Sequence, residues 1–342
     1  MIRVLVVGLG QMGQSHALAY AASPAYQVVG LVNRSDVIPP AALAHLTIER
    51  DFDAALARLA PDMVAIATYS DSHADLAIKA MQAGAHVFVE KPLASNVADC
   101  ARVAQVAADT GRKLMVGHIL RHHPTWQALI AEARALRGPY VFRLNLNQRS
   151  TGPAWEIHKA LMQSTPPIVD CGVHYVDVMC QITDAAPVEV RGMGLRLSDE
   201  IAPEMYNYGH FQVLFEDGSC GWYEAGWGPM MSDTAHFVKD VVSPGGAVSL
   251  RAPHGVASAD VEGHTAADQL IVAPTGQRET RYNFPDSPGH QDLCARQAAA
   301  MAGAIADDHD LSRHIADAVR AVAICLAADE SVRSGSPVRL KP

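Results

Sequence analysis

Short, nearly continuous apolar runs alternate with segments of helical spacing along the first third of the chain. Runs of this kind are typical of parallel strands that are covered by helices on both faces. They are Val4–Val7, Val28–Val32, Met63–Ala67, His86–Val89 and Leu114–Val116. Helix patterns lie between them at about residues 11–22, 74–83 and 97–110. The alternation predicts an α/β fold, a doubly wound parallel sheet, over residues 1–120.

The pattern changes after about residue 120. Residues 140–148 alternate with a period of two, which predicts a strand with one buried face. Further strand candidates follow at 188–197, 208–215, 220–226, 235–242, 247–250, 269–273 and 279–283, with turn signals between several of them. Two helix patterns at 291–306 and 312–334 come last. We therefore expect a second, α+β domain over residues 121–342 with a large, mostly antiparallel open sheet.

Composition and charge narrow the function classes. The 342 residues are 49% hydrophobic and 18% charged, which excludes a disordered chain. A formal charge of −9 argues against a nucleic-acid or anionic-membrane partner. The apolar runs fall short of the roughly 18 residues that span a bilayer. Six cysteines without a C-x-x-C pair, and a strand that starts at Ile2, predict a cytoplasmic protein without a signal peptide.

A glycine motif follows the first strand and opens the first helix. Gly8, Gly10 and Gly13 match G-x-G-x-x-G, with Gln11 and Met12 between them. The first glycine permits a tight turn, the second lets a pyrophosphate approach the backbone, and the third allows close packing of helix and strand. Amides at the helix N-terminus then hold the negative charge. The context predicts a dinucleotide site.

The end of the second strand bears on which dinucleotide binds. NAD sites usually place Asp or Glu there to accept hydrogen bonds from the ribose. This chain has Asn33, Arg34 and Ser35 instead. Asn33 does not repel a 2′-phosphate, and the Arg34 guanidinium can pair with it. NADP is therefore favoured over NAD, although Asn33 can also serve the ribose of NAD.

Two further segments carry candidate chemistry. Lys91 ends a predicted parallel strand, at the sheet edge where such folds bind ligands. Asp170 and His174 are spaced i, i+4 at the start of a predicted helix, so the carboxylate can orient the imidazole. An imidazole with a pKa near neutrality suits proton removal from an alcohol. Taken singly, Lys91 can also be a surface lysine and His174 a buried structural histidine.

The three motifs together resemble one family. The glycine motif, Glu90-Lys91-Pro92 and the segment from Asp170 to Asp177 occur in this order. The chain resembles the glucose–fructose oxidoreductase/inositol dehydrogenase (Gfo/Idh/MocA) family of NAD(P)-dependent oxidoreductases along essentially its whole length. The resemblance implies that Lys91 hydrogen-bonds the reacting hydroxyl, Asp170 binds substrate and tunes its neighbour, and His174 is the general acid/base. It implies that Pro92 is the family's proline, often in a cis peptide.

The resemblance also implies further cofactor and substrate contacts. Thr68 and His73 match a family loop in which Tyr69 replaces the usual proline, so we expect rearranged contacts to the nicotinamide. Gly117–Arg121 resembles the family's Gly-Phe-Asn-Arg-Arg stretch with His118 and Leu120 substituted. Its last residue, Arg121, is a candidate cofactor or substrate contact, and Glu90 is a candidate cofactor contact. Ser164–Val169 departs from the family's glycine-rich lead before Asp170, and Pro166-Pro167 stiffens that loop.

Polar side chains in the second half complete the candidate substrate site. The candidates that touch substrate, beside Lys91, Asp170 and His174, are His118, Asn145, Trp155 and His158. The alternative is that this polar face is simply solvated. Three histidines that are close in sequence could be considered as metal ligands, namely His118, His122 and His123. No cysteine partner lies near them in the sequence, so we expect no metal.

These observations predict an NAD(P)-dependent dehydrogenase that interconverts a secondary alcohol and a ketone on a sugar, inositol or related polyol. The polyol assignment rests on the resemblance. A catalytically silent NAD(P)-binding sugar sensor and a redox-assisted glycosidase remain as alternatives. We also expect a homo-oligomer, a dimer or tetramer, that forms through the open sheet face.

Overall fold

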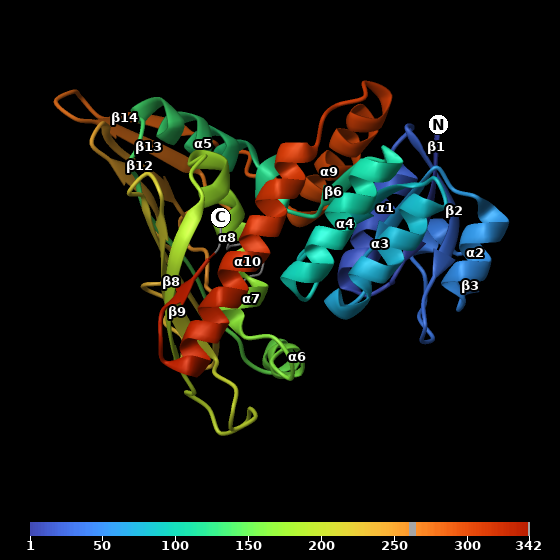
Figure 1. Ribbon diagram of the computed structural model, residues 1–342, viewed down its shortest axis with the longest axis horizontal. Helices are drawn as coiled ribbons and strands as arrows, with labels where there is room; N and C mark the ends of the chain where they lie inside the picture. Colours follow the sequence, from blue (N-terminus) through green and yellow to red (C-terminus); the bar gives the residue numbers. More distant parts are fainter. Residues whose placement is uncertain (260–264, 341–342) are drawn as a thin grey trace. The chain divides into compact units, whose positions relative to one another are not determined.

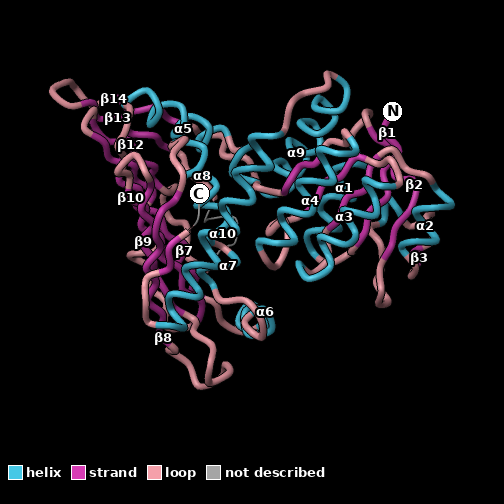
Figure 2. The backbone as a smooth tube through the Cα atoms, in the orientation of Figure 1, coloured by secondary structure: helices cyan, strands magenta, loops and turns pink. Residues whose placement is uncertain are grey.

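The computed structural model describes residues 1–259 and 265–340, and these residues form two compact units. Residues 1–122 and 289–319 make up unit 1, and residues 123–288 and 320–342 make up unit 2. Each unit contains one sheet with its own helices (Figures 1 and 2). Within the described residues, no helix is long and apolar enough to cross a membrane.

Unit 1 is a parallel six-stranded sheet in the order β3-β2-β1-β4-β5-β6. Its strands are β1 (Ile2–Val7), β2 (Tyr26–Val32), β3 (Ile48–Glu49), β4 (Met63–Ile66), β5 (His86–Val89) and β6 (Leu114–Val116). Its helices are α1 (Gln11–Ala22), α2 (Phe52–Leu59), α3 (His73–Gln82), α4 (Val97–Thr110) and α9 (His290–Ala306). Three short 3₁₀ turns join them at Ala41–Leu43, Ser70–Ser72 and Ile119–His122. The predicted doubly wound parallel sheet is confirmed.

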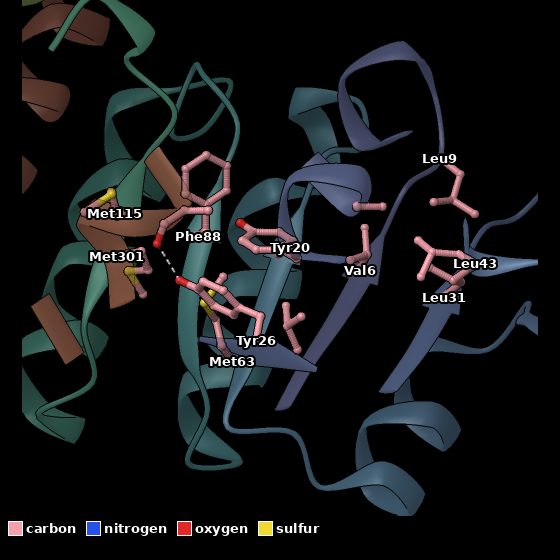
Figure 3. Packing of buried hydrophobic residues seen from close by; sticks show 14 of the residues in the cluster. Val6, Leu9, Tyr20, Tyr26, Leu31, Leu43, Met63, Phe88, Met115 and Met301 are labelled. Carbon is pink, nitrogen blue, oxygen red and sulfur yellow. Dashed lines mark hydrogen bonds between the residues drawn. The ribbon is translucent and has the colours of Figure 1, made fainter. Parts of the chain in front are cut away.

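The core of unit 1 lies between the sheet and the helices α1 and α9. Tyr20, Met63, Phe88 and Met301 belong to this cluster, and Leu31 lies at its other end, beside Leu9 and Leu43 (Figure 3). The Tyr26 hydroxyl donates a hydrogen bond of 2.7 Å to the Ala298 carbonyl, so the one polar atom of this ring is satisfied within the core. The contact fixes α9 on the sheet although the two residues are 272 positions apart.

Unit 2 is a nine-stranded sheet in the order β14-β13-β12-β11-β7-β10-β9-β8-β15. The strands are β7 (Val141–Arg149), β8 (Pro187–Leu195), β9 (Tyr208–Phe215), β10 (Cys220–Gly228), β11 (Lys239–Ser243), β12 (Gly246–Arg251), β13 (Gln269–Pro274), β14 (Thr280–Asn283) and β15 (Val338–Arg339). The β7–β10 pair is parallel and the other pairs are antiparallel, as expected for a mostly antiparallel sheet.

Helices lie along one face of this sheet (Figure 1). They are α5 (Pro124–Leu136), α6 (Pro153–Leu161), α7 (Pro167–Asp170), α8 (Gly172–Ile182) and the C-terminal part of α10 (Ser312–Ser334). Phe142, Tyr223 and Phe211 are fully buried on the covered face. The other face carries the row Leu214, Cys220, Val141 and Val242, which pair across four strands. Leu214, Val141 and Val242 are 36–47% exposed.

Several predicted boundaries differ from the structure. Residues 289–319 pack with unit 1, whereas the prediction assigned all of residues 121–342 to one domain. The reason is that α9 packs on α1 beside the first sheet, a contact that sequence spacing does not reveal. The predicted strand over residues 235–242 begins only at Lys239. Helices α2 and α6 were not predicted, because α2 has only eight residues and α6 nine.

The helix around the Asp170 motif also differs from the prediction. Pro167 occupies the first turn of the short helix α7, and Asp170 is its last residue. Helix α8 then starts at Gly172, with Cys171 between them in a helical conformation. Asp170 and His174 therefore belong to two consecutive helices rather than to one. The Pro-Pro step, predicted as a stiff loop, instead begins a helix, because proline tolerates the first helical position.

Candidate functional site

The glycine loop between β1 and α1 has the geometry of a dinucleotide cradle. Gly8 has a φ of +88°, and a Cβ there would lie 2.5 Å from the Ala67 carbonyl oxygen. A Cβ on Gly13 would lie 1.9 Å from the Gly8 carbonyl oxygen. At Gly10, by contrast, no described atom lies within 4 Å of the Cβ position. Gly8 and Gly13 are thus required by the fold, and Gly10 leaves the space that a pyrophosphate needs.

The N-terminus of α1 is suited to an anion. Gly10 is the N-cap residue, and neither a side-chain cap nor an acidic residue in the first turn is present at this described helix end. The amides of the first turn, including those of Gln11 and Met12, therefore face solvent at the positive end of the helix dipole. These residues fit the phosphates of NAD(P). The nicotinamide of a bound cofactor would accept the hydride.

Asn33, at the end of β2, is already engaged within the protein. Its Oδ1 accepts a hydrogen bond from the Leu9 amide at 2.9 Å, and its Nδ2 donates to the Ser35 carbonyl at 2.8 Å. Asn33 therefore pins the glycine loop to β2. Arg34 beside it is exposed, and its carbonyl accepts a hydrogen bond from Arg50 at 2.7 Å. Arg50 is a second cation at this edge that the sequence patterns did not single out.

A short loop after β4 places Thr68, Tyr69 and His73. The Tyr69 ring is 74% exposed at the carboxyl edge of the sheet. His73 is buried, and its two ring nitrogens lie 2.8 Å from the Pro92 carbonyl oxygen and 3.1 Å from that of Thr68. Burial lowers the pKa of His73, so the neutral ring donates to one of these carbonyls at a time. His73 joins the two loops from inside the protein.

The Glu90–Pro92 segment follows β5 as predicted. The Lys91–Pro92 peptide is cis, which confirms the expectation from the family resemblance. Glu90 is buried, and its Oε2 accepts a hydrogen bond of 3.1 Å from the Lys91 amide. Its Oε1 lies 2.6 Å from His16 Nε2 on α1. Glu90, predicted to contact the cofactor, is thus an internal anchor of the turn that carries Lys91.

Arg121 and His118 lie on the segment after β6 in unit 1. The Arg121 guanidinium donates a hydrogen bond of 3.0 Å to Asp317, which also accepts one from Arg313 at 2.8 Å. Because Asp317 is fully buried, this network fixes Arg121 against α10. His118 is buried as well, and burial together with the charge of Arg121 holds its pKa well below the usual range.

In unit 2, Asp170 and His174 lie at the junction of α7 and α8. Both side chains are partly exposed, whereas the other residues of α8, apart from Gln181, are buried. The Cys171 thiol lies 3.8 Å from Asp170 Oδ2 and donates a weak hydrogen bond to it. Partial exposure leaves this acid and this histidine accessible to a substrate.

Trp155 and His158 lie on α6, a helix that the sequence patterns did not predict. The His158 ring stacks on Trp227 of β10, with centroids 4.3 Å apart and an angle of 7° between the planes. Burial lowers the pKa of His158 to about 4, and the negative charge of Asp170 opposes this shift. His158 is therefore neutral at pH 7. Trp227 lies in an aromatic-rich segment, and its pairing with α6 was not foreseeable from spacing.

Asn145, a predicted substrate contact, is buried in the sheet. Its Oδ1 accepts hydrogen bonds from the Val238 amide at 2.7 Å and from Lys239 Nζ at 3.3 Å. Lys239 Nζ also donates to the Asn145 carbonyl and lies 4.5 Å from the centre of the Tyr175 ring. Burial lowers the pKa of Lys239 to about 7. Asn145 joins β7 to the start of β11, and the lysine beside it is a polar core group that sequence patterns missed.

The structure thus brings the predicted residues together in two sets, one in each unit. Unit 1 gathers the glycine loop, Asn33 to Ser35, the loop of Thr68 to His73, and Lys91 at the carboxyl edge of one parallel sheet. Unit 2 gathers Asp170, His174 and His158 on its helices. Among the described residues, no group of three or more His, Cys, Asp or Glu side chains could hold a metal ion.

Two family models match this chain. Residues 2–118 match the oxidoreductase family with an NAD-binding Rossmann fold, and residues 131–235 match the Gfo/Idh/MocA C-terminal domain. The two matches correspond to the parallel sheet of unit 1 and to much of the mixed sheet of unit 2. The first of these descriptions is that of an NAD-binding domain, in agreement with the open cradle at Gly10.

Individual relatives are dehydrogenases. The chain is 30% identical over 194 residues to UDP-N-acetylglucosamine 3-dehydrogenase of Acidithiobacillus ferrooxidans, covering 57% of this chain and 58% of that protein. It is 28% identical over 218 residues to inositol 2-dehydrogenase of Acidothermus cellulolyticus, covering 60% of each. The matched region therefore spans less than two thirds of these relatives. An oxidoreductase domain protein from Kribbella flavida shares the fold, with a TM-score of 0.80, 22% identity and coverage of 100% and 99%.

Proposed function

Because this chain belongs to the Gfo/Idh/MocA family of NAD-binding oxidoreductases, we propose that it oxidises a secondary alcohol on a sugar, inositol or related polyol, reversibly and with NAD(P). The observation that carries this proposal is the cradle at Gly10, open at an uncapped helix N-terminus in a parallel sheet. A polyol substrate is supported by relatives named for inositol and for a UDP-sugar.

In this proposal His174 is the general acid/base. Its imidazole takes the proton of the reacting hydroxyl during oxidation and returns it during reduction. Partial exposure on α8 leaves the ring accessible, and Asp170 on the preceding helix supplies a nearby carboxylate that orients it and binds an adjacent hydroxyl. Lys91, at the end of β5, stabilises the negative charge that develops on the substrate oxygen. His158 and Trp155 on α6 bind further hydroxyls.

The preferred cofactor in this proposal is NADP. The support is local: Arg34 is exposed at the end of β2, Arg50 is hydrogen-bonded to its backbone, and Asn33 puts no charge there. A 2′-phosphate next to two guanidinium groups gains charge-assisted hydrogen bonds that the hydroxyl of NAD cannot make. The negative charge of Asp36, which pairs with Arg50, opposes the binding of a 2′-phosphate.

The test is nicotinamide absorbance with the purified protein, NAD⁺ and NADP⁺ in parallel, over a panel of inositols, aldoses and glycosides. We expect reduction with one class of polyol, faster with NADP⁺, and its loss in His174→Ala. Conversion of a glycoside without net reduction of the cofactor would instead indicate a redox-assisted glycosidase. Cofactor binding without turnover of any compound would indicate a sensor and would remove the dehydrogenase proposal.

A further inference from the structure

A buried contact joins the cofactor-binding helix to the turn that carries Lys91. His16 lies on α1, in the second turn after the glycine loop, and Glu90 directly follows β5. His16 Nε2 and Glu90 Oε1 are 2.6 Å apart, and the two side chains are only 1% and 8% exposed. Burial of a carboxylate is unfavourable unless it is hydrogen-bonded, so this contact stabilises Glu90 in its place.

The second oxygen of the same carboxylate holds the backbone of Lys91. Glu90 Oε2 accepts a hydrogen bond of 3.1 Å from the Lys91 amide. One oxygen of the carboxylate therefore contacts α1, and the other contacts the turn that carries Lys91. A rotation of the Glu90 side chain would break both contacts, so whatever fixes the carboxylate also fixes the amide.

The surroundings leave the pair little freedom. The His16 ring packs against Phe88 of β5 with centroids 4.6 Å apart, and against Tyr20 on its own helix at 6.3 Å. A Cβ at Gly117 would lie 2.9 Å from Glu90 Oε1, so a larger residue there would displace the carboxylate. Aromatic rings and backbone together hold the imidazole and the carboxylate in one arrangement.

We propose that His16 is a positioning residue for the reaction: through Glu90 it fixes the backbone of Lys91 and hence the place from which the lysine side chain acts. The inference rests on the role proposed above for Lys91. His16 touches neither substrate nor cofactor in this account and acts only through the carboxylate. The same pair links the helix whose N-terminus forms the phosphate cradle to the turn that carries the lysine.

A purely structural pair would behave differently on replacement. Removal of one partner of a buried pair lowers stability whatever the role of the pair, because the other group is left unpaired. A positioning role predicts loss of turnover in the folded protein as well, because small displacements of a group that contacts the reacting atoms cost about 10²-fold in rate. Turnover and the order of the Lys91 turn are therefore the quantities to measure.

The experiment compares wild-type protein with His16→Ala, His16→Gln and Lys91→Ala. Amide hydrogen exchange at Lys91 is measured on cofactor-free protein, and kcat and the cofactor Kd are measured with the active polyol from the panel. We expect His16→Ala to accelerate exchange at Lys91 and to lower kcat by about 10- to 100-fold, with the cofactor Kd changed by less than about threefold. His16→Gln keeps a donor and recovers part of both losses.

The matched control is Tyr26→Phe, which removes a buried hydrogen bond from the same unit but away from Lys91. We expect it to lower stability without changing kcat or exchange at Lys91. If His16→Ala does not fold, His16→Asn is used in its place. The asparagine side chain is too short for its amide to reach Glu90 from α1, so this variant also removes the contact.

Two results would overturn the inference alone. The first is an amide exchange rate at Lys91 that is the same in His16→Ala as in the wild type. The second is a kcat of His16→Ala equal to that of the wild type, although Lys91→Ala is inactive. A wild-type protein that reduces neither cofactor with any compound would remove the proposed function, and the inference with it.

Discussion

At the scale of single residues, the three glycines of the loop after β1 have different roles. The fold requires Gly8 and Gly13, because an added Cβ would lie only 2.5 and 1.9 Å, respectively, from a backbone carbonyl oxygen. Gly10 has a φ of −66°, which suits any residue, and open space at its Cβ position within the described structure. The fold therefore does not require glycine at residue 10, and we propose that cofactor binding does.

Substitution of Gly10 and Gly13 separates these two roles. We expect Gly10→Ala to fold with a melting temperature close to that of the wild type and to bind NAD(P)H about tenfold more weakly, a loss of about 1.4 kcal/mol. Gly13→Ala should lose stability, because its Cβ would overlap the Gly8 carbonyl. Fluorescence titration and thermal unfolding measure the two effects. Unchanged affinity in Gly10→Ala would contradict a phosphate cradle at this loop.

How much of the site could be predicted also depends on single residues. The glycine motif and the Lys91–Pro92 turn were predictable, because local sequence determines a strand followed by a tight turn. Asn33 was correctly placed at the end of β2, but its contact with the Leu9 amide depends on a side-chain rotamer. The contact of His16 with Glu90 joins residues 74 positions apart, and no spacing rule encodes it.

At the scale of elements, the strands were predicted better than the helices that pack on them. β5, β6 and β9 and the helices α4 and α10 begin and end at the predicted residues, because their apolar runs stop at clear turn or cap signals. α4, for example, begins after Asn96, whose side chain accepts the Asp99 amide, and ends at Gly111 with a φ of +65°. α6 was missed, because Gly152 and Pro153 in sequence indicate a turn as readily as a helix start.

The packing of α6 on β10 has a consequence for stability at low pH. Burial lowers the pKa of His158 from about 6.5 in the unfolded chain to about 4 in the folded protein. The unfolded state therefore binds the proton more tightly, and the fold loses stability as pH falls from 6.5 to 4. The difference between these two pKa values sets an upper limit of about 3.4 kcal/mol on this loss.

The variant His158→Phe keeps a ring against Trp227 and removes the titration. We expect its free energy of unfolding, measured with denaturant at pH 7 and pH 4.5, to change less between the two pH values than that of the wild type. An equal change in both proteins would show that His158 titrates normally.

At the scale of the whole molecule, the sheet of unit 2 presents an apolar row on the face opposite its helices. Leu214, Val141 and Val242 are 43%, 47% and 36% exposed, and they pair across neighbouring strands. Water contact over such a continuous row is unfavourable, and extended apolar patches commonly mark interaction surfaces. We propose that a second copy of this chain covers the row.

Mass measurement by light scattering tests this assembly. We expect the wild type to be a dimer or tetramer and Leu214→Glu to have a smaller mass, because a charge introduced into the row opposes its burial. Ile38→Glu is the matched control, since Ile38 is 87% exposed and belongs to unit 1, whereas the row belongs to the sheet of unit 2. A monomeric wild type, or an unchanged mass in Leu214→Glu, would contradict the proposed interface.

The most direct test of the central claim follows the hydride itself. The active polyol, labelled with deuterium at its carbinol carbons, is incubated with the protein and oxidised cofactor, and the reduced nicotinamide is analysed by mass spectrometry. The account predicts one deuterium in the reduced cofactor and none in the His174→Ala reaction. Reduced cofactor without deuterium, or a labelled polyol consumed while the cofactor stays oxidised, would contradict direct hydride transfer to the cofactor as the reaction of this protein.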